Sequence, residues 1–386
     1  MAIMEKDIGI IYVFLKNKTM RVPFFNYQHI FKSREDKLLE IIKDVGNRGA
    51  FILQKDLEEF EKNLAEYIGV KYAVGVANGT DAIWLALLAA GIGRGDEVIF
   101  ASHTYIATAN AIKFVGAIPI PADCRDDHMI DPQSVQSLIS NKTKAILPTQ
   151  LNGRCCDMES LTKIATDNNL IIIEDAAQGL GAKFKGSGIG TFDKGATISF
   201  YPAKNLGCLG DGGAFVTNDK EMFEKVNILR DHGRDENGIF VEWGFNSRLD
   251  NLQAAILNYK LSYYNEEVKR RREIAGIYQK ELGHLKEIHL PPGPDSDQNY
   301  FDVFQNYEIE AERRDLLKKY LSENGIGTII QWNGQPVHSI VALGFKGSGL
   351  PYTEEMYKKC LMLPMNTSLS NQEVKYVCNK IKNFYE

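Results

Sequence analysis

Cysteine is scarce in this chain, with six in 386 residues, and no two cysteines form a C-x-x-C pair. A disulfide framework and a thiolate zinc site are therefore not indicated, and reduced thiols in a cytoplasmic protein are expected. The seven histidines include no pair at metal-ligand spacing and no H-E-x-x-H motif. The sequence therefore predicts no metal site.

An excess of charge of one sign is also missing. Lys and Arg total 45 against 50 Asp and Glu, which gives a net charge of −5. Because nucleic-acid binders usually carry a basic surface, this balance argues against DNA or RNA as a partner. Hydrophobic residues at 44% and charged residues at 25% are typical of a globular protein.

No hydrophobic run is long enough to cross a membrane. The apolar stretch at residues 8–15 falls well short of the ~20 residues that a spanning helix needs. Neither an anchor nor a signal peptide is expected. Met20 opens a natural-looking start, so residues 1–19 are interpreted as an upstream extension and are left out of the fold prediction.

Short β-rich runs alternate with helical patterns in the first two thirds of the chain. The runs are residues 72–76, 97–101, 118–122, 144–147, 170–173, 196–200 and 214–217. Several are apolar throughout, as buried parallel strands are. Helical patterns at residues 81–90, 107–115 and 158–168 lie between some of them. The alternation predicts an α/β fold with a mostly parallel seven-stranded sheet flanked by helices.

A smaller C-terminal α+β domain is expected to follow the sheet. A helical pattern at residues 250–282 would link the large domain, residues 20–252, to this second domain, residues 253–386. Strand-like runs at 301–309 and 327–332 flank a helical pattern at 313–324. Ser370 and Glu373 form a capping box that opens a last helix.

The common nucleotide and hydrolase signatures are absent. There is no Gly-Lys dipeptide, which excludes a P-loop, and no G-x-S-x-G motif. The glycines from Gly179 to Gly190 are out of register for G-x-G-x-x-G, so a dehydrogenase is disfavoured.

Three segments together suggest one reactive site. The apolar strand at 170–173 runs into Asp175 and Gln178, Lys204 lies in a glycine-containing loop, and Asn78-Gly79-Thr80 opens a buried helix. Alone, such an Asp is usually a helix cap and such a Lys a surface charge. Together they offer helix N–H groups to a phosphate, a carboxylate to a pyridinium nitrogen and an amine to an aldehyde.

From about residue 22 to its C-terminus the chain resembles the DegT/DnrJ/EryC1/StrS sugar aminotransferases, which are fold-type-I enzymes dependent on pyridoxal 5′-phosphate (PLP). Six ordered motifs carry the resemblance: NGTDA at 78–82, GDEVI at 95–99, EDAAQ at 174–178, SFYPAKNLG at 199–207, GDGGA at 210–214 and GFNSRLDNLQAA at 244–255.

The resemblance implies a role for each matched residue. Lys204 would form the Schiff base with PLP and then carry the proton, and the cofactor would alternate with pyridoxamine 5′-phosphate. Asp175 would pair with the pyridine nitrogen, and Gln178 would lie near the phenolic oxygen. The phosphate would be held by Gly79, Thr80 and Ser199.

Two further residues complete the implied cofactor site. Tyr105 would lie over the cofactor ring, although core packing is the commoner role of a single Tyr in such a position. Asn246 would reach the phosphate from a neighbouring subunit, so the resemblance implies a homodimer with shared sites. An Asn in a loop otherwise serves most often in a turn.

Two segments depart from the family pattern. Gln150 to Gly153 stand where His-Leu-Tyr-Gly is frequent, and residues 331–338 replace the common Tyr-Pro-x-Pro-Leu-His. Both are expected to face the substrate, with Asn152 and His338 as candidate contacts. A His packed at the surface of the small domain is an equally good interpretation of His338.

The resemblance thus implies a transaminase that moves an amino group from L-glutamate to a nucleotide-linked keto-deoxysugar for surface glycan assembly. The favoured acceptor is a dTDP-3-oxo-6-deoxyhexose, and a UDP- or GDP-linked 4-oxo sugar is the alternative. Related PLP enzymes that dehydrate sugars have His in place of the lysine, so Lys204 argues against that class. A non-catalytic binding or regulatory protein with the same fold is the alternative of another kind.

Overall fold

The computed structural model describes residues 20–345 and 349–386. The interpretation of residues 1–19 as an extension lies outside these ranges. Among the helices in the described ranges, none combines the length and apolar character needed to cross a membrane. All six cysteines are buried and unbridged.

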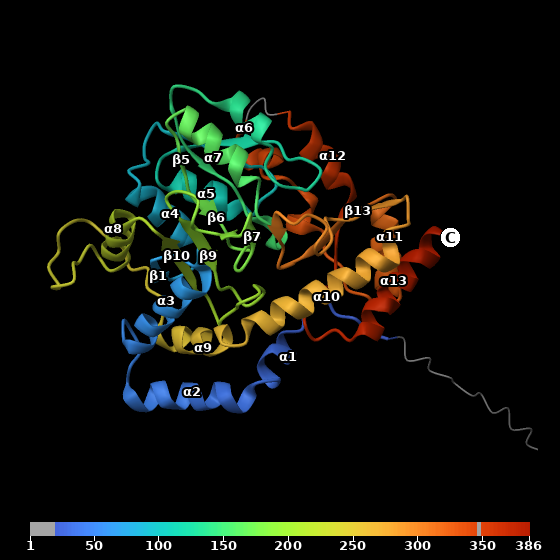
Figure 1. The fold of residues 1–386 in the computed structure, drawn as a ribbon, viewed down its shortest axis with the longest axis horizontal. Coiled ribbons are helices and arrows are strands. Elements are labelled where there is room, and N and C mark those ends of the chain that lie inside the picture. Colours follow the sequence, from blue (N-terminus) through green and yellow to red (C-terminus); the bar gives the residue numbers. More distant parts are fainter. Residues whose placement is uncertain (1–19, 346–348) are drawn as a thin grey trace, which may run out of the picture.

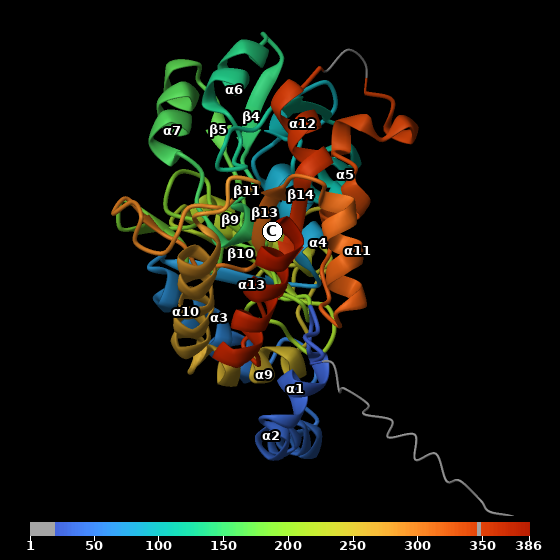
Figure 2. The same cartoon turned by 90° about the vertical axis from the view of Figure 1, so that its right-hand side faces the viewer.

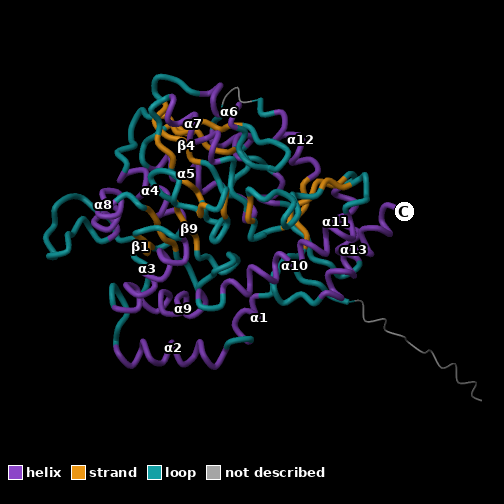
Figure 3. The backbone as a smooth tube through the Cα atoms, viewed as in Figure 1, coloured by secondary structure: helices purple, strands orange, loops and turns teal. Residues whose placement is uncertain are grey.

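At the centre of the molecule two four-stranded sheets join into one larger sheet (Figure 3). Its members are β1 (Tyr72–Val76), β2 (Glu97–Ala101), β3 (Ile118–Ala122), β4 (Thr143–Leu147), β5 (Ile171–Ile172), β6 (Glu174–Asp175), β9 (Ala196–Ser199) and β10 (Gly213–Thr217). The strands β5 and β6 are two parts of one strand, interrupted at Ile173, whose N–H bonds to Ile146 of β4. The order is therefore β3-β2-β4-β5/β6-β9-β10-β1, with β10 alone antiparallel to its neighbours. The predicted fold class is confirmed.

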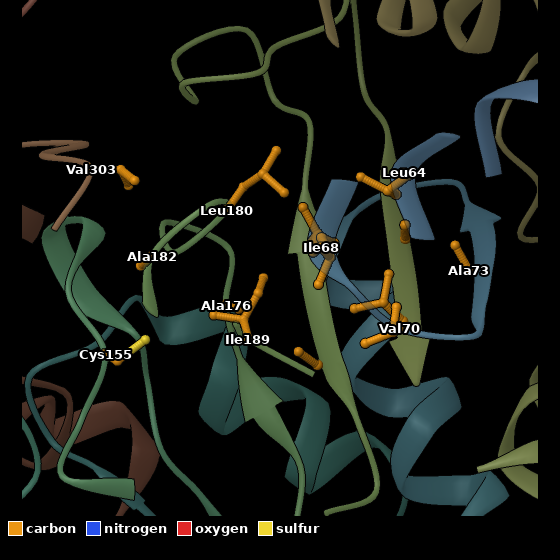
Figure 4. Packing of buried hydrophobic residues seen from close by; sticks show 14 of the residues in the cluster. Leu64, Ile68, Val70, Ala73, Cys155, Ala176, Leu180, Ala182, Ile189 and Val303 are labelled. Carbon is orange, nitrogen blue, oxygen red and sulfur yellow. The ribbon is translucent and has the colours of Figure 1, made fainter. Parts of the chain in front are cut away.

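Helices cover both faces of this sheet (Figure 1). The helices that pack against the first face are α4 (Gly79–Ala89), α5 (Ile106–Phe114) and α8 (Lys220–Arg230). Those that pack against the second face are α3 (Lys55–Ile68), α6 (Pro132–Leu138), α7 (Met158–Asp167) and α9 (Asn251–Leu261). Alternate strand residues serve the two faces, as with Val74 and Val76 on the first and Ala73 on the second. Figure 4 shows the second core, in which Leu64 and Ile68 of α3 lie across from Ala176 and Ile189.

A smaller antiparallel sheet occupies the C-terminal part, in the order β11 (Ile288–His289), β13 (Tyr307–Ala311) and β14 (Cys360–Leu363). Around it lie α10 (Tyr264–Leu282), α11 (Arg314–Glu323), α12 (Pro351–Lys359) and α13 (Asn371–Tyr385), the last opened by the predicted Ser370–Glu373 capping box (Figure 2).

Several predicted elements differ in detail. The helical pattern at 250–282 is two helices, α9 and α10, separated at Ser262 and Tyr263. The run at 301–309 contains only the end of β12 (Tyr300–Phe301) and the start of β13, because Phe304 has a left-handed backbone with φ 49°. Residues 327–332 make one bridge, Ile329 to Met362, and no strand. The run at 327–332 therefore contacts the small sheet without joining it as a regular strand.

The described chain also holds elements that the sequence analysis did not predict. Helices α1 (Tyr27–Lys32) and α2 (Glu35–Arg48) lie beneath α9 and α10 in Figure 1, and a small sheet joins β12, β7 (Lys183–Phe184) and β8 (Ser187–Gly188). Val22 pairs with Ile326 and belongs to the core of the small sheet. The boundary expected near residue 253 lies inside α9. The division into residues 20–252 and 253–386 therefore stays a prediction.

The strand directions bring the predicted site residues to one edge of the large sheet. Strands β1, β2, β4, β6 and β9 all run the same way, so their carboxyl ends lie along a common edge. Asn78, His103, Thr149, Asp175 and Ser199 follow or end these strands. Ligands of α/β sheets bind at this edge.

Candidate active site

Lys204 lies in the loop that follows β9. Gln305 holds this loop on both sides of the lysine: its Oε1 accepts from the Asn205 N–H at 2.7 Å, and its Nε2 donates to the Ala203 carbonyl at 2.8 Å. Burial lowers the pKa of the Lys204 ammonium to about 8, although the nearby Asp175 carboxylate opposes the shift. A sizeable fraction of the amine is thus neutral and nucleophilic near neutral pH.

Asp175 is the last residue of β6 and is 4% exposed. Its Oδ2 accepts from the Thr108 hydroxyl at 2.6 Å and its Oδ1 from the Ala177 N–H at 3.2 Å. Burial raises the pKa of Asp175, and these two donors and Lys204 oppose the increase. Because each carboxylate oxygen has two lone pairs, Asp175 can still accept from a further N–H, such as that of a pyridinium ring.

The N-terminus of α4 lies against the end of β9. Asn78 caps the helix by accepting from the Asp81 N–H at 2.9 Å. A Cβ on Gly79 would lie 2.8 Å from the Ser199 Cβ, so only glycine allows this approach. The Gly79 and Thr80 N–H groups precede the first intrahelical bond and are free to bind an anion beside the Ser199 hydroxyl.

Gln178 lies three residues after Asp175 and has a fixed amide orientation. Its Oε1 accepts from the Asn152 backbone N–H at 2.8 Å and from Asn306 Nδ2 at 3.1 Å. Since a backbone N–H can only donate, the atom facing Asn152 must be the oxygen. The Nε2 hydrogens of Gln178 are therefore the groups presented to a ligand.

The Tyr105 side chain is 57% exposed at the start of α5. Its ring centroid lies 6.5 Å from that of Trp332, a residue of the segment that departs from the family pattern. The two rings form an aromatic wall beside the strand edge. Tyr105 is thus exposed beside the site, and its contact with the cofactor ring stays a prediction.

The predicted substrate residues are engaged within the chain. His338 is buried, with Nδ1 2.5 Å from the Ser102 hydroxyl and Nε2 3.3 Å from Glu354. The Asn152 side chain forms hydrogen bonds with Glu308, Asn306 and Gln331. Their contact with substrate stays a prediction.

Gln150, which the sequence analysis placed in a substrate-facing segment, points into the core instead. It is fully buried, donating to Glu174 at 2.6 Å and accepting from the Cys156 N–H at 2.6 Å. Its amide has a structural role.

Asn246 precedes Ser247, whose hydroxyl donates to Asp81 in the first turn of α4 at 2.7 Å. Asn246 is exposed and lies at the base of a loop that projects beyond α8 (Figure 1). Its backbone forms a single isolated bridge with that of Asp231. The tip of this loop exposes Phe240 at 69% and Trp243 at 95%. The reach of Asn246 into a partner's site stays a prediction.

His103, His128 and Glu308 form a buried cluster that the sequence analysis did not foresee. Their ligand atoms lie close enough to hold a metal ion. The separations of 2.9 and 3.0 Å between Glu308 Oε2 and the two ring nitrogens match hydrogen bonds. Ligand atoms of a tetrahedral metal with bonds of ~2.0 to 2.1 Å would lie about 3.3 Å apart. The cluster is better described as a hydrogen-bonded network.

The sequence analysis missed several residues that hold the predicted site residues in place. Thr108 could have been suggested by its place one helical turn after Thr104 in the segment of Tyr105. Gln305, Asn306 and Glu308 could not, because each acts on a residue 100 or more positions away.

The residues fit PLP as a group. Lys204 offers an amine with a lowered pKa, and Asp175 a buried carboxylate with a free lone pair. Gly79 and Ser199 form a close-packed cradle with N–H and hydroxyl donors.

The comparisons with known proteins agree with this geometry. The model of the DegT/DnrJ/EryC1/StrS aminotransferase family matches residues 32–382. The chain is 38% identical over 371 residues to a "pleiotropic regulatory protein" of Geobacillus stearothermophilus, covering 95% of this chain and 99% of the relative. It is also 38% identical over 374 residues to the dTDP-3-amino-3,4,6-trideoxy-alpha-D-glucose transaminase of Streptomyces venezuelae, covering 96% and 97%. The crystal structure of S. venezuelae DesV in complex with a ketimine intermediate matches with a TM-score of 0.91 and 37% identity, covering 95% of this chain and 99% of that one.

Proposed function

The chain belongs to the DegT/DnrJ/EryC1/StrS aminotransferase family, and on this basis we propose that it transfers an amino group from L-glutamate to the keto group of a nucleotide-linked deoxysugar. In this exchange glutamate becomes 2-oxoglutarate and the sugar ketone becomes an amine, so no external oxidant or reductant is needed. We place the reaction in the cytoplasm, in the assembly of surface glycans.

The protein is a PLP-dependent transaminase. When bound, PLP supplies an electron sink for the carbon that loses its proton. Lys204 supports this activity most directly, because burial lowers the pKa of its ammonium and so makes it both a nucleophile and a proton carrier. We assign Lys204 the covalent link to the cofactor and the transfer of the proton.

The other predicted residues bind and orient the cofactor. Asp175 would keep the pyridine nitrogen protonated, and Gln178 would donate its Nε2 to the phenolic oxygen. The α4 N-terminus at Gly79 and Thr80 would hold the phosphate together with Ser199. Tyr105 would cover the ring. Asn246 would reach the phosphate of the partner subunit, so that the working unit is a homodimer.

We propose a dTDP-3-oxo-6-deoxyhexose as the acceptor, giving a 3-amino sugar. The support is the 38% identity, over nearly the whole of both chains, to a transaminase whose name specifies a dTDP-linked 3-amino sugar. The segments around Asn152 and Trp332 depart from the family pattern beside the site, and they are where we expect the acceptor to be recognised.

The test begins with the glutamate half-reaction. The purified holoenzyme should change its visible absorbance when L-glutamate alone is added, and Lys204→Ala should abolish the change while leaving the fold intact. The matched control is Lys194→Ala, which removes a lysine that pairs with Asp219 at the surface. The glutamate-charged enzyme should then aminate one member of a panel of dTDP-, UDP- and GDP-linked keto-sugars.

The glutamate half-reaction also distinguishes a catalytic protein from a regulatory one. A regulatory role is suggested by the name of one relative. A holoenzyme that binds PLP but shows no glutamate-dependent change would support the non-catalytic alternative. Amination of a 4-oxo sugar alone would overturn the dTDP-3-oxo assignment and leave the transaminase activity standing.

A further inference from the structure

A buried carboxylate on the small sheet connects to the predicted cofactor site. Glu308 lies on β13 and is 1% exposed. Its Oε2 accepts from His103 Nε2 at 2.9 Å, His128 Nδ1 at 3.0 Å and Asn152 Nδ2 at 3.1 Å. All three donors come from loops at the carboxyl edge of the large sheet, so one carboxylate oxygen of the small sheet binds three groups of the large sheet.

The hydrogen-bond partners fix the charges in this cluster. Both ring nitrogens of His128 face carboxylates, Glu308 at 3.0 Å and Glu310 at 3.2 Å. Since ionised carboxylates only accept, both nitrogens must donate and His128 is an imidazolium. His103 donates from Nε2 to Glu308, and its Nδ1 accepts from the Tyr357 hydroxyl at 2.9 Å, so it is neutral.

The charge of Glu308 fixes the amide of Asn152. Because an anion faces this amide, the Nδ2 end must point to Glu308 and Oδ1 must point away. Oδ1 then accepts from Gln331 Nε2 at 2.7 Å and Asn306 Nδ2 at 2.9 Å. The side chain holds the residue in a left-handed backbone conformation with φ 55°.

The backbone of Asn152 completes the connection. Its N–H donates to Gln178 Oε1 at 2.8 Å, and Asn306 donates to the same oxygen at 3.1 Å. These two donors leave the Nε2 hydrogens of Gln178 directed away, toward the predicted ligand. A neutral group at position 308 would offer both donors and acceptors and would let the Asn152 amide turn over.

We propose that Glu308 is a positioning residue for the cofactor, acting through Asn152 to hold the Gln178 amide with its N–H groups toward the phenolic oxygen. The proposal rests on the cofactor role of Gln178 given under the proposed function, and it does not depend on which sugar is aminated.

The test compares the two carboxylates that accept hydrogen bonds from His128. Glu308→Gln removes the charge that faces Asn152, whereas the control Glu310→Gln removes the charge on the other side of His128 and leaves the Glu308–Asn152 bond in place. The readout is the pH titration of the visible absorbance of the holoenzyme. An N–H bonded to the phenolic oxygen stabilises its anionic form, so loss of that bond should make the cofactor hold its shared proton to higher pH.

The midpoint of this titration should rise by about one pH unit in Gln178→Ala and in Glu308→Gln. It should stay within about 0.2 unit of wild type in Glu310→Gln. The double variant Gln178→Ala with Glu308→Gln should shift no further than Gln178→Ala alone, because both changes remove the same bond.

Additive shifts in the double variant would overturn the proposal, as would equal shifts in Glu308→Gln and Glu310→Gln. An unchanged midpoint in Gln178→Ala would overturn it too, whereas the sugar panel tests the proposed function by itself. If Glu308→Gln does not fold, Asn152→Gly carries the comparison, since glycine accepts the left-handed backbone and lacks the amide. A different result would be that the purified protein holds one metal ion per chain and loses both the ion and its activity on chelation. That result would overturn the proposal and show that the cluster is a metal site.

Discussion

Thr108 donates a hydrogen bond of 2.6 Å to the buried carboxylate of Asp175. Thr108 in turn contacts the Thr104 hydroxyl at 2.9 Å, to which Thr149 donates at 2.9 Å. The carboxylate that we assign to the pyridine nitrogen is thus held by a chain of hydroxyls from two neighbouring strand ends.

Loss of the Thr108 hydroxyl should destabilise the ionised form of Asp175. In Thr108→Val the pKa of Asp175, already raised by burial, should rise further, because a donor to its ionised form is lost. We expect turnover to fall about tenfold and the acid limb of the pH–rate profile to move to higher pH. Thr104→Val, which touches Thr108 but not Asp175, should leave the acid limb in place; a shift of the same size would mean that the direct bond to Asp175 is unimportant.

The second prediction concerns the free amine of Lys204. Because its pKa lies near 8, about a tenth of the amine is neutral at pH 7, roughly 300-fold more than for a lysine of pKa 10.5. Reconstitution of the apoenzyme with PLP, followed by the growth of visible absorbance, should accelerate between pH 6.5 and 8 and then level off. An acceleration that continues to pH 10 would show that burial does not lower the pKa of this lysine.

The close approach of α4 to β9 gives a third prediction. A methyl group at Gly79 would lie 2.8 Å from the Ser199 Cβ, so Gly79→Ala should displace the helix N-terminus from the phosphate position. We expect PLP affinity to fall at least about tenfold. Gly46→Ala is the control, because a Cβ there meets nothing within 4 Å in helix α2. That control should keep its affinity and melt no lower than wild type.

The fourth prediction follows from His128. Burial alone would lower its pKa, but Glu308 and Glu310 raise it to about 9, above the 6.5 of a free imidazole. A folded-state pKa above the unfolded value means that the stabilisation is complete below about pH 6.5 and is lost as the pH rises through about 9. The shift corresponds to roughly 3 kcal/mol. The melting temperature of wild type should therefore fall relative to that of His128→Gln between pH 7 and 9.5, and a constant difference would contradict the imidazolium assignment.

The last prediction tests the shared site. If Asn246 reaches the partner's phosphate, Asn246→Asp should be severely impaired, because its charge would repel that phosphate. Mixing this variant with Lys204→Ala should restore activity after subunit exchange, since one site of each heterodimer then carries neither lesion. Heterodimers that form from folded subunits and remain inactive would place Asn246 in its own chain's site.

Much of the large sheet was predictable because its signals are local. Buried strands show as short apolar runs, and all seven predicted runs correspond to positions in the central sheet. The motifs of Lys204, Asp175 and Gly79 were readable for the same reason, since each sits at a strand end or helix start. In the C-terminal part, the apolar run at 327–332 packs against its surroundings without forming a strand, so the local sequence pattern predicted the wrong secondary structure there.

By itself, then, the sequence predicted the α/β sheet and, through its resemblance to a known family, the residues that we propose bind PLP, because strand patterns and loop motifs each lie in neighbouring positions. Only the tertiary structure decided how these residues are held. Thr108 acts on Asp175 across 67 positions, Gln305 on Asn205 across 100, and Glu308 on Asn152 across 156. A hydrogen bond needs its partners close in space, and partners this far apart along the chain meet only when the strands, helices and loops that carry them have packed together.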